Sequence, residues 1–260
     1  EKYRAKARAL GLDTAPALVR GEAFAFNQKL GRHIERRVLQ SDPAYAAMIE
    51  NLDTNIGRLV DVLRAAGRWE NTLLVFTSDN GGLSTAESSP TCNAPLAEGK
   101  GWAEEGGNRE PLLITWPARI APGSTCAEPV TSPDFFPTLL AAAGLPAEPR
   151  HHVDGVSFLP ALLGQPFRRG PIFWHYPHYS NQGGRPCGAV RADDWKLIEH
   201  FEDGRLRLFN LRNDIGEQHD LAARHPETTR RLHELLRAWR AEVGALVPRP
   251  NERWMAPAND

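Results

Sequence analysis

The chain has 260 residues, 41% of them hydrophobic and 24% charged, and its 31 Lys and Arg nearly balance its 32 Asp and Glu. This composition is typical of a globular protein that can bury a sizeable core. It argues against nucleic-acid binding, because no long basic run is present, and no apolar stretch reaches the roughly 20 residues of a membrane span. The three cysteines, Cys92, Cys126 and Cys187, match neither a zinc motif nor a disulfide framework.

The first half of the chain predicts an α/β arrangement. Residues 1 to about 40 are charged and weakly patterned, and we expect a surface loop with a short helix there. Apolar residues at three- and four-residue steps from Pro43 to about Ala66 predict an amphipathic helix, and Gly67 is a natural stop. The apolar run 72–77 then predicts a strand buried on both faces, which ends in a polar segment.

The rest of the chain predicts one more strand of that sheet and then a change of character. A long loop over 83–110 precedes a buried strand over 112–116, and a helix begins near Ser132. After about Gly164, a smaller antiparallel sheet and a final helix are expected. The predicted strands are 173–176, 187–192, 195–201 and 205–209, and the predicted helix is 226–243.

Asp79 and Asn80 follow the first buried strand directly. Ligands of open α/β sheets lie beyond the carboxyl ends of the strands, and carboxylate and amide oxygens suit a hard cation such as calcium or magnesium. The same dipeptide followed by two glycines could equally form an Asx turn that caps the strand. Two ligands would not fill a calcium shell of about six to eight oxygens, so others must come from elsewhere.

Two cationic side chains in the long loop are candidates for contact with an anion. Lys100 lies between two glycines, so its ammonium and backbone could approach a ligand closely, or it could be a solvated loop lysine. Arg109 could clamp an oxyanion, or it could pair with Glu104, Glu105 or Asp79 and stiffen the loop. Neither reading is decided by the residues alone.

His175 and His178 belong to an aromatic cluster at the start of the second half, Trp174-His175-Tyr176-Pro177-His178-Tyr179. Such a cluster can line a pocket for a sugar or an aryl group. It can also be a hydrogen-bonded packing seam between the two predicted sheets.

Several segments in sequence order resemble the formylglycine-dependent (type I) sulfatases of the alkaline phosphatase superfamily. The segment 70–82, Glu-Asn-Thr-Leu-Leu-Val-Phe-Thr-Ser-Asp-Asn-Gly-Gly, resembles their metal-ligand segment. Gly99-Lys100-Gly101 and the following Glu105-Gly106-Gly107-Asn108-Arg109-Glu110-Pro111 look like their catalytic-lysine loop. Segments at 134–138, 154–157 and 190–222 fit as well, so the resemblance runs from about Tyr45 to Trp239.

The resemblance implies a fold, a reaction and roles for particular residues. It implies part of an alkaline-phosphatase-like sheet sandwiched by helices over 1–165, and a small C-terminal antiparallel α+β subdomain over 166–260. Asp79 and Asn80 would be two ligands of an active-site Ca²⁺, or Mg²⁺, and Lys100 would contact the sulfate oxygen. His175 and Arg109 would be substrate-binding residues. The reaction implied is hydrolysis of the sulfate ester of a sugar or an aryl alcohol.

The sequence departs from that family because it lacks the nucleophile motif, Cys/Ser-x-Pro-x-Arg. Cys92 and Cys126 are each followed by a proline one place late and by no arginine, and Cys187 is followed by no proline. In the family this motif, with further metal ligands, lies upstream of the matched region. We therefore expect the formylglycine to be absent from these residues, a missing N-terminal half to be the partner, and the 260 residues alone to be inactive and to bind calcium weakly. The unpartnered sheet would expose an edge and an apolar face.

Two other functions are compatible with the same residues. One is a phosphodiesterase or phosphonate monoester hydrolase of the same superfamily, and the other is a non-catalytic module that binds sulfated glycans. The family resemblance also implies a periplasmic, secreted or lysosomal protein, although no leader is visible in the sequence.

Overall fold

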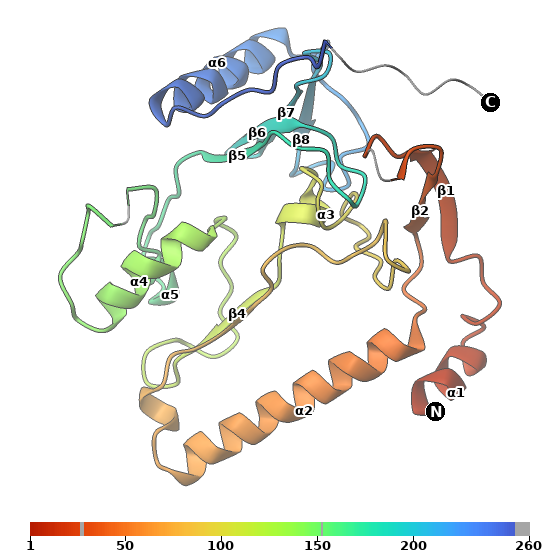
Figure 1. Ribbon diagram of the computed structural model, residues 1–260. Helices are drawn as coiled ribbons and strands as arrows, with labels where there is room; N and C mark the ends of the chain where they lie inside the picture. Colours follow the sequence, from red (N-terminus) through yellow and green to blue (C-terminus); the bar gives the residue numbers. More distant parts are fainter. Residues whose placement is uncertain (27–28, 152, 253–260) are drawn as a thin grey trace. The chain divides into compact units, whose positions relative to one another are not determined.

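The computed structural model describes residues 1–26, 29–151 and 153–252, which form a mixture of helices and sheets (Figure 1). The chain divides into two compact units. One unit contains residues 1–45, 79–110 and the chain from 173 onward, and the other contains 46–78 and 111–172. The expected boundary between 1–165 and 166–260 stays a prediction.

In the first unit, a four-stranded sheet has the order β5-β6-β7-β8, with the pairs β6–β7 and β7–β8 antiparallel. The small C-terminal sheet expected from alternating residues and turn signals is confirmed. Asp193 lies in the turn between the second and third strands, and its φ of 53° lies in the left-handed region that Asp tolerates better than most residues. The strands are β5 (Ile172–Tyr176), β6 (Cys187–Ala192), β7 (Trp195–His200) and β8 (Leu206–Asn210).

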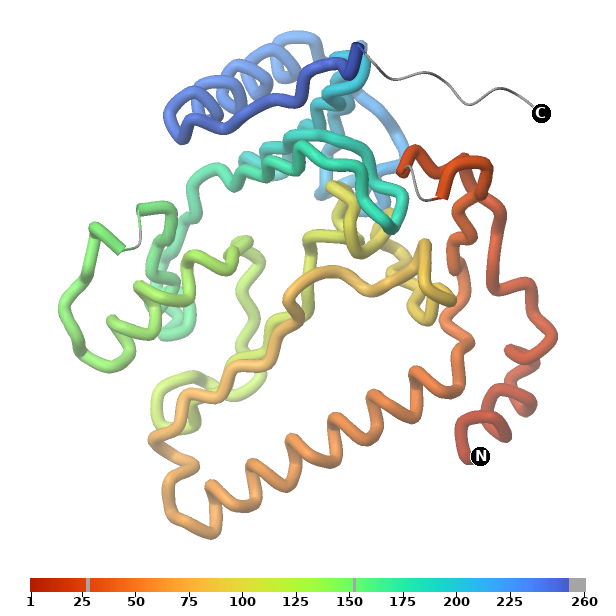
Figure 2. Tube along the Cα trace, in the orientation of Figure 1, coloured from red at the N-terminus to blue at the C-terminus, as the bar shows by residue number. Residues whose placement is uncertain are grey.

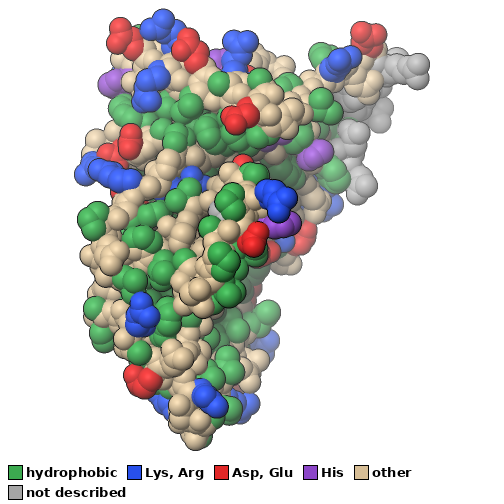
Figure 3. Space-filling model, turned by 90° about the vertical axis from the view of Figure 1, so that its left-hand side faces the viewer, with side chains coloured by type: hydrophobic (Ala, Val, Ile, Leu, Met, Phe, Trp, Pro, Cys, Tyr) green, Lys and Arg blue, Asp and Glu red, His purple; other side chains and the backbone are tan. Residues whose placement is uncertain are grey.

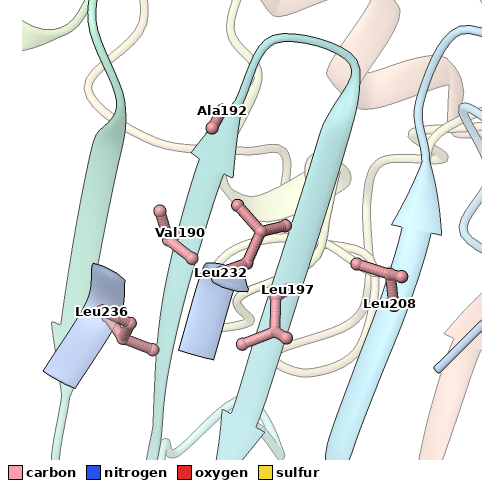
Figure 4. Packing of buried hydrophobic residues seen from close by; sticks show 6 residues of the cluster. All are labelled: Val190, Ala192, Leu197, Leu208, Leu232 and Leu236. Carbon is pink, nitrogen blue, oxygen red and sulfur yellow. The ribbon is translucent and has the colours of Figure 1, made fainter. Parts of the chain in front are cut away.

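The predicted final helix is confirmed as α6 (Pro226–Glu242), and it covers one face of this sheet. Proline in its first turn suits a helix start, because that position needs no backbone donor. Side chains from three strands pack with two leucines of α6, all of them buried, and Phe173 of β5 stacks on Trp239 with ring centroids 4.8 Å apart. Figure 4 shows this cluster: Val190, Ala192, Leu197, Leu208, Leu232 and Leu236.

The N-terminal part of the chain corrects the prediction of a surface loop. The short helix is present as α1 (Lys2–Ala9), but residues further on form an antiparallel hairpin of β1 (Leu18–Ala23) and β2 (His33–Arg37). Its strands are mostly exposed and charged, and only Ile34 is fully buried. A strand with one core residue shows no alternation of apolar and polar residues, so the pattern in the sequence was too weak to reveal it.

The second unit contains most of α2 (Pro43–Ala65), then the 3-10 helix η2 (Trp69–Asn71) and an antiparallel pair of β3 (Leu74–Thr77) and β4 (Leu112–Thr115). The helix, both strands and their positions are confirmed. The prediction that the strands are buried on both faces is wrong, because Phe76 is 37% and Leu113 60% exposed. Among the described residues β3 and β4 pair only with each other, so neither has a neighbour on its second edge.

The rest of this unit is organised around Asp134, whose side chain is fully buried. It ends the 3-10 helix η3 (Ser132–Asp134), which leads into α4 (Phe135–Ala142) and is followed further on by α5 (Leu159–Leu162). Its carboxylate accepts backbone N–H bonds from Thr131 and Val156, both at 2.8 Å, and pairs with Arg169 at 3.0 Å. These contacts explain why the segments 134–138 and 154–157 occur together.

A large apolar surface remains uncovered, as expected. No residue of α2 is buried, and Met48 of its apolar stripe is 67% exposed. Figure 3 shows apolar side chains widely distributed over the face it draws. Exposed apolar area of this kind usually marks a surface that associates with other protein.

Truncation of a leucine in the α6 cluster should destabilise the first unit. We expect Leu236→Ala to lower the free energy of unfolding by about 2–5 kcal/mol, because a fully buried side chain leaves a cavity. Urea unfolding followed by tryptophan fluorescence would measure this. The exposed neighbour Arg237 is the control, and an equal loss in Arg237→Ala would contradict the assigned packing.

Candidate active site

The predicted metal ligands and the predicted catalytic lysine lie on two segments that contact each other inside the first unit. Asp79 and Asn80 begin the long connection that leads from β3 to β4, and Lys100 lies in its middle; Figure 2 shows this connection in its orange-to-yellow part. The Lys100 backbone N–H donates to the Gly82 carbonyl at 3.1 Å, and the Gly81 N–H donates to the Gly107 carbonyl at 3.1 Å. The structure therefore brings together the turn 79–82 and the loop 99–109, which lie about 20 residues apart in sequence.

Glycine is required where these two segments touch. A Cβ on Gly81 would lie 1.7 Å from the Gly106 carbonyl oxygen, and one on Gly99 would lie 2.3 Å from the Gly82 carbonyl oxygen. No side chain can occupy either position without moving the backbone. The glycines around Asn80 and Lys100 thus serve close packing of two loops, which explains their abundance in this stretch of sequence.

A side-chain amide reinforces the contact. The Asn93 Nδ2 donates to the carbonyls of both Gly82 and Glu98 at 2.8 Å, and the Ser84 hydroxyl donates to the Glu98 carbonyl at 3.0 Å. The sequence offered no reason to single out Asn93, because its function depends on two carbonyls from distant positions. It lies beside Cys92, which is a free cysteine.

The functional groups themselves lie at the surface of this buried framework. The Asp79 and Lys100 side chains are exposed and Asn80 is half-buried. Lys100 has the buried Gly99 on one side and Gly101, with a φ of 82°, on the other. Backbone hydrogen bonds of Gly81 and Lys100 hold the two segments together. The exposed side chains of Asp79 and Lys100 can therefore face a ligand from a fixed backbone.

Glu110 is a second acidic group, which lies near Asp79 and to which the sequence pattern assigns no role. Burial, together with the negative charge of Asp79, raises the pKa of Glu110 to about 7. Its Oε1 is buried and accepts no hydrogen bond. A carboxyl group of this kind next to a carboxylate and an amide oxygen makes an all-oxygen donor set, which is the type that calcium and magnesium prefer.

The donor set fits a hard cation but is incomplete. Within the described ranges, no group of three or more His, Cys, Asp or Glu is placed to hold a metal ion. Asp79 and Asn80 therefore remain the two predicted ligands, with Glu110 beside them.

Arg109 lies at the end of the same loop, after the short helix α3 (Glu105–Asn108). Its guanidinium is 3.7 Å from the Glu105 carboxylate, four residues earlier, and its side chain is 46% exposed. This contact is the pairing with a neighbouring carboxylate that the sequence allowed as the alternative to anion binding. Because the guanidinium is partly exposed, it is still accessible to a substrate. The substrate-binding role of Arg109 stays a prediction.

His175 is not brought to Lys100 by any described contact. Its Nε2 lies 2.9 Å from the Leu246 carbonyl, and its ring lies 5.4 Å from the Phe201 ring. These contacts are those of a packing seam between β5 and the segment after α6. The predicted place of His175 in a substrate pocket stays a prediction.

Comparison with known proteins places the whole arrangement in one family. The family model described as Sulfatase matches residues 4–145, and that described as N-sulphoglucosamine sulphohydrolase, C-terminal, matches residues 99–242. A protein named Sulfatase from Formosa agariphila is 35% identical over 81% of this chain and 41% of its own length. Human Arylsulfatase A is 33% identical over 75% of this chain and 43% of its own length. The chain thus spans about two fifths of the length of these relatives.

Solved structures agree with the sequence comparison. Ps i-CgsB in complex with k-i-k-neocarrahexaose superposes with a TM-score of 0.67 at 33% identity, over 76% of this chain and 43% of that one. A phosphonate monoester hydrolase of Agrobacterium radiobacter has a TM-score of 0.57 at 24% identity, over 77% and 41% of the two chains, and so shares the fold. The expected α/β fold of the alkaline phosphatase type is thereby confirmed. Since one family model covers more than half of these residues, the chain belongs to the sulfatase family.

Proposed function

We propose that the full-length protein hydrolyses the sulfate ester of a sugar or an aryl alcohol, and that this chain contributes Asp79, Asn80 and Lys100 to the active site. The observation that carries the proposal is the backbone contact between the turn 79–82 and the loop 99–109. That contact brings an oxygen-donor pair and an ammonium into one region of one unit. A sulfate ester requires both a cation for its oxygens and a donor for charge that develops on them.

Asp79 and Asn80 would hold Ca²⁺, or Mg²⁺, through a carboxylate and an amide oxygen. When bound, the cation would polarise the sulfate and stabilise negative charge on its oxygens. Glu110, with its unpartnered buried Oε1, supports an all-oxygen site at this position. The remaining ligands, and the formylglycine nucleophile of the family, are expected outside these residues.

Lys100 would bind a sulfate oxygen on the side of the leaving alcohol. An ammonium is a compact point charge with three donors, suited to an oxygen whose charge grows as the ester bond breaks. Arg109 would add a second cation at the rim, and His175 would be at most a residue of the substrate pocket. The match of human Arylsulfatase A and of a solved complex titled with D-Glucosamine-2-N, 6-O-disulfate supports both aryl and sugar sulfates as substrate classes.

The cellular compartment of the protein is proposed from its family. No described helix is both long and apolar enough to cross a membrane. Export to the periplasm or the exterior, or delivery to lysosomes, is proposed from the resemblance alone.

Removal of the ammonium should reduce turnover. In the full-length protein, Lys100→Ala should lower kcat/KM for 4-nitrophenyl sulfate by about 10²–10³-fold, the effect expected of one donor to developing charge. Lys6→Ala on the exposed α1 is the matched control and should leave the rate unchanged. Turnover of bis(4-nitrophenyl) phosphate or of a phosphonate ester above that of the sulfate would instead favour a phosphodiesterase or phosphonate hydrolase.

Removal of the carboxylate should weaken metal binding independently of any reaction. Asp79→Ala should reduce the Ca²⁺ affinity of the full-length protein by at least about tenfold in isothermal titration calorimetry, because a charged ligand is lost. Asp53→Ala on exposed α2 is the control. An unchanged affinity would exclude Asp79 as a ligand, and binding of sulfated glycans that survives both Lys100→Ala and calcium removal would favour the non-catalytic module.

A further inference from the structure

The face of the four-stranded sheet opposite α6 carries a row of cations that the proposed reaction does not use. Side chains alternate between the two faces of a strand, so Arg191 of β6, Lys196 of β7 and Arg207 of β8 lie on the same face. Arg191 and Lys196 are direct partners in the register, as are Ile198 and Arg207. Aromatic and aliphatic side chains surround the row on this face: Trp174, Cys187, Ala189, Ile198 and Phe209.

The segment that packs on these cations is the loop that carries Lys100. The Lys196 ammonium lies 2.9 Å from Glu105 Oε1, and Arg191 lies 3.6 Å from Glu105 Oε2. Arg207 pairs with Glu104 at 2.9 Å. Two consecutive acidic residues of the loop are thus held by three strands of the sheet, and Figure 1 shows α3 and α6 on opposite sides of it.

Glu217, in the turn that follows β8, completes the arrangement. Its Oε1 lies 3.1 Å from the Lys196 ammonium, and its Oε2 accepts the Glu105 backbone N–H at 2.5 Å. Its φ of 51° lies in the left-handed region, which a residue with a side chain adopts where its surroundings fix it. The Lys196 side chain is 0% exposed, and those of Glu105 and Glu217 are 2% and 0% exposed.

A buried charge in this position is costly unless partners hold it, so the three groups depend on one another. Burial alone would raise the pKa of Glu105, but Lys196, Arg191 and Arg109 outweigh it and lower that pKa. Burial raises the pKa of Glu217 to about 7, against the attraction of Lys196. Burial would lower the pKa of Lys196, but the carboxylates of Glu217 and Glu105 outweigh it and raise that pKa, so the ammonium depends on both partners.

Short backbone bonds transmit this anchoring to the candidate site. The Gly106 N–H donates to Ala97 at 2.7 Å, and the Arg109 N–H donates to Glu105 at 2.7 Å. The Gly107 carbonyl accepts from Gly81, directly after Asn80. A shift of Glu105 would therefore move both the lysine loop and its contact with the turn 79–82.

We infer that Lys196, together with Glu105 and Glu217, is a positioning residue that holds the loop 99–109, and with it Lys100, in place against the turn that carries Asp79 and Asn80. The inference rests on the proposed function for its catalytic consequence. The anchoring itself can be measured without any reaction. Through this anchoring, the C-terminal sheet would position active-site residues without contacting the substrate itself.

The test compares Lys196→Met with Arg240→Met in the full-length protein. Arg240 of α6 pairs with Glu199 of β7 at 2.6 Å, with side-chain exposures of 9% and 14%, on the other face of the same sheet. Both variants remove one cation from a mostly buried ion pair of β7. Only Lys196 contacts the loop, so any general loss of stability appears in both.

Hydrogen–deuterium exchange should separate the two variants. In Lys196→Met, peptides covering 99–109 should exchange at least tenfold faster than in the parent, while peptides of α6 change little. In Arg240→Met the pattern should be reversed. Equal acceleration of 99–109 in both variants, or none in Lys196→Met, would overturn the inference.

Kinetics with a sulfate ester gives a second, independent reading. Lys196→Met should lower kcat by about 10-fold or more while KM stays within about threefold, because a misplaced Lys100 loses contacts made in the transition state. A KM increase with unchanged kcat, or the same fall in Arg240→Met, would contradict it. If the parent protein hydrolyses no sulfate ester, the proposed function fails, and exchange alone decides the anchoring.

A milder variant covers the case in which Lys196→Met does not fold. Glu105→Gln keeps the size of the side chain and removes its charge, while Lys196 retains Glu217. Exchange of 99–109 should again rise relative to α6. A loop that exchanges as in the parent would overturn the inference.

Discussion

The ammonium of Lys196, enclosed between the carboxylates of Glu105 and Glu217, is the contact on which the candidate site depends. A buried ion pair contributes little net stability, since the desolvation of its charges offsets their attraction, but loss of one partner leaves the others uncompensated. Such a group specifies position more than it adds stability. Here it specifies where a glycine-rich loop, with little side-chain packing of its own, meets a folded sheet.

This anchoring explains why segments distant in sequence form one compact unit. The sheet β5–β8 is stabilised on one face by the apolar cluster with α6, and its other face is left for the loop. The division between an apolar face and a partly charged one follows from the alternation of side chains along each strand. Residues that meet a ligand can then remain exposed, because rigidity is supplied from beneath by residues that do not meet it.

The protein has two chemically different kinds of exposed surface, one polar and one apolar. Around Asp79 and Lys100 the exposed groups are polar, and backbone hydrogen bonds join the two segments that carry them, which suits an anionic ligand and a cation. Along α2 and at Leu113 large apolar side chains are exposed, and their removal from water would be favourable. The chain spans about two fifths of the length of its curated relatives, and these are the faces on which further protein would be stabilising.

The sequence by itself determined the local elements and the chemistry of the site residues. Helix α2, the strands of the C-terminal sheet and helix α6 follow from apolar periodicity and turn residues, and Asp79, Asn80 and Lys100 stood out because they belong to recognisable segments. The tertiary structure alone decided what depends on distant partners. It revealed the hairpin β1–β2, the role of Asn93, the exposure of β3 and β4, the seam around His175 and the burial of Lys196. Each of these depends on which residues from elsewhere in the chain lie opposite, and a periodicity that is read along one segment carries no information about them.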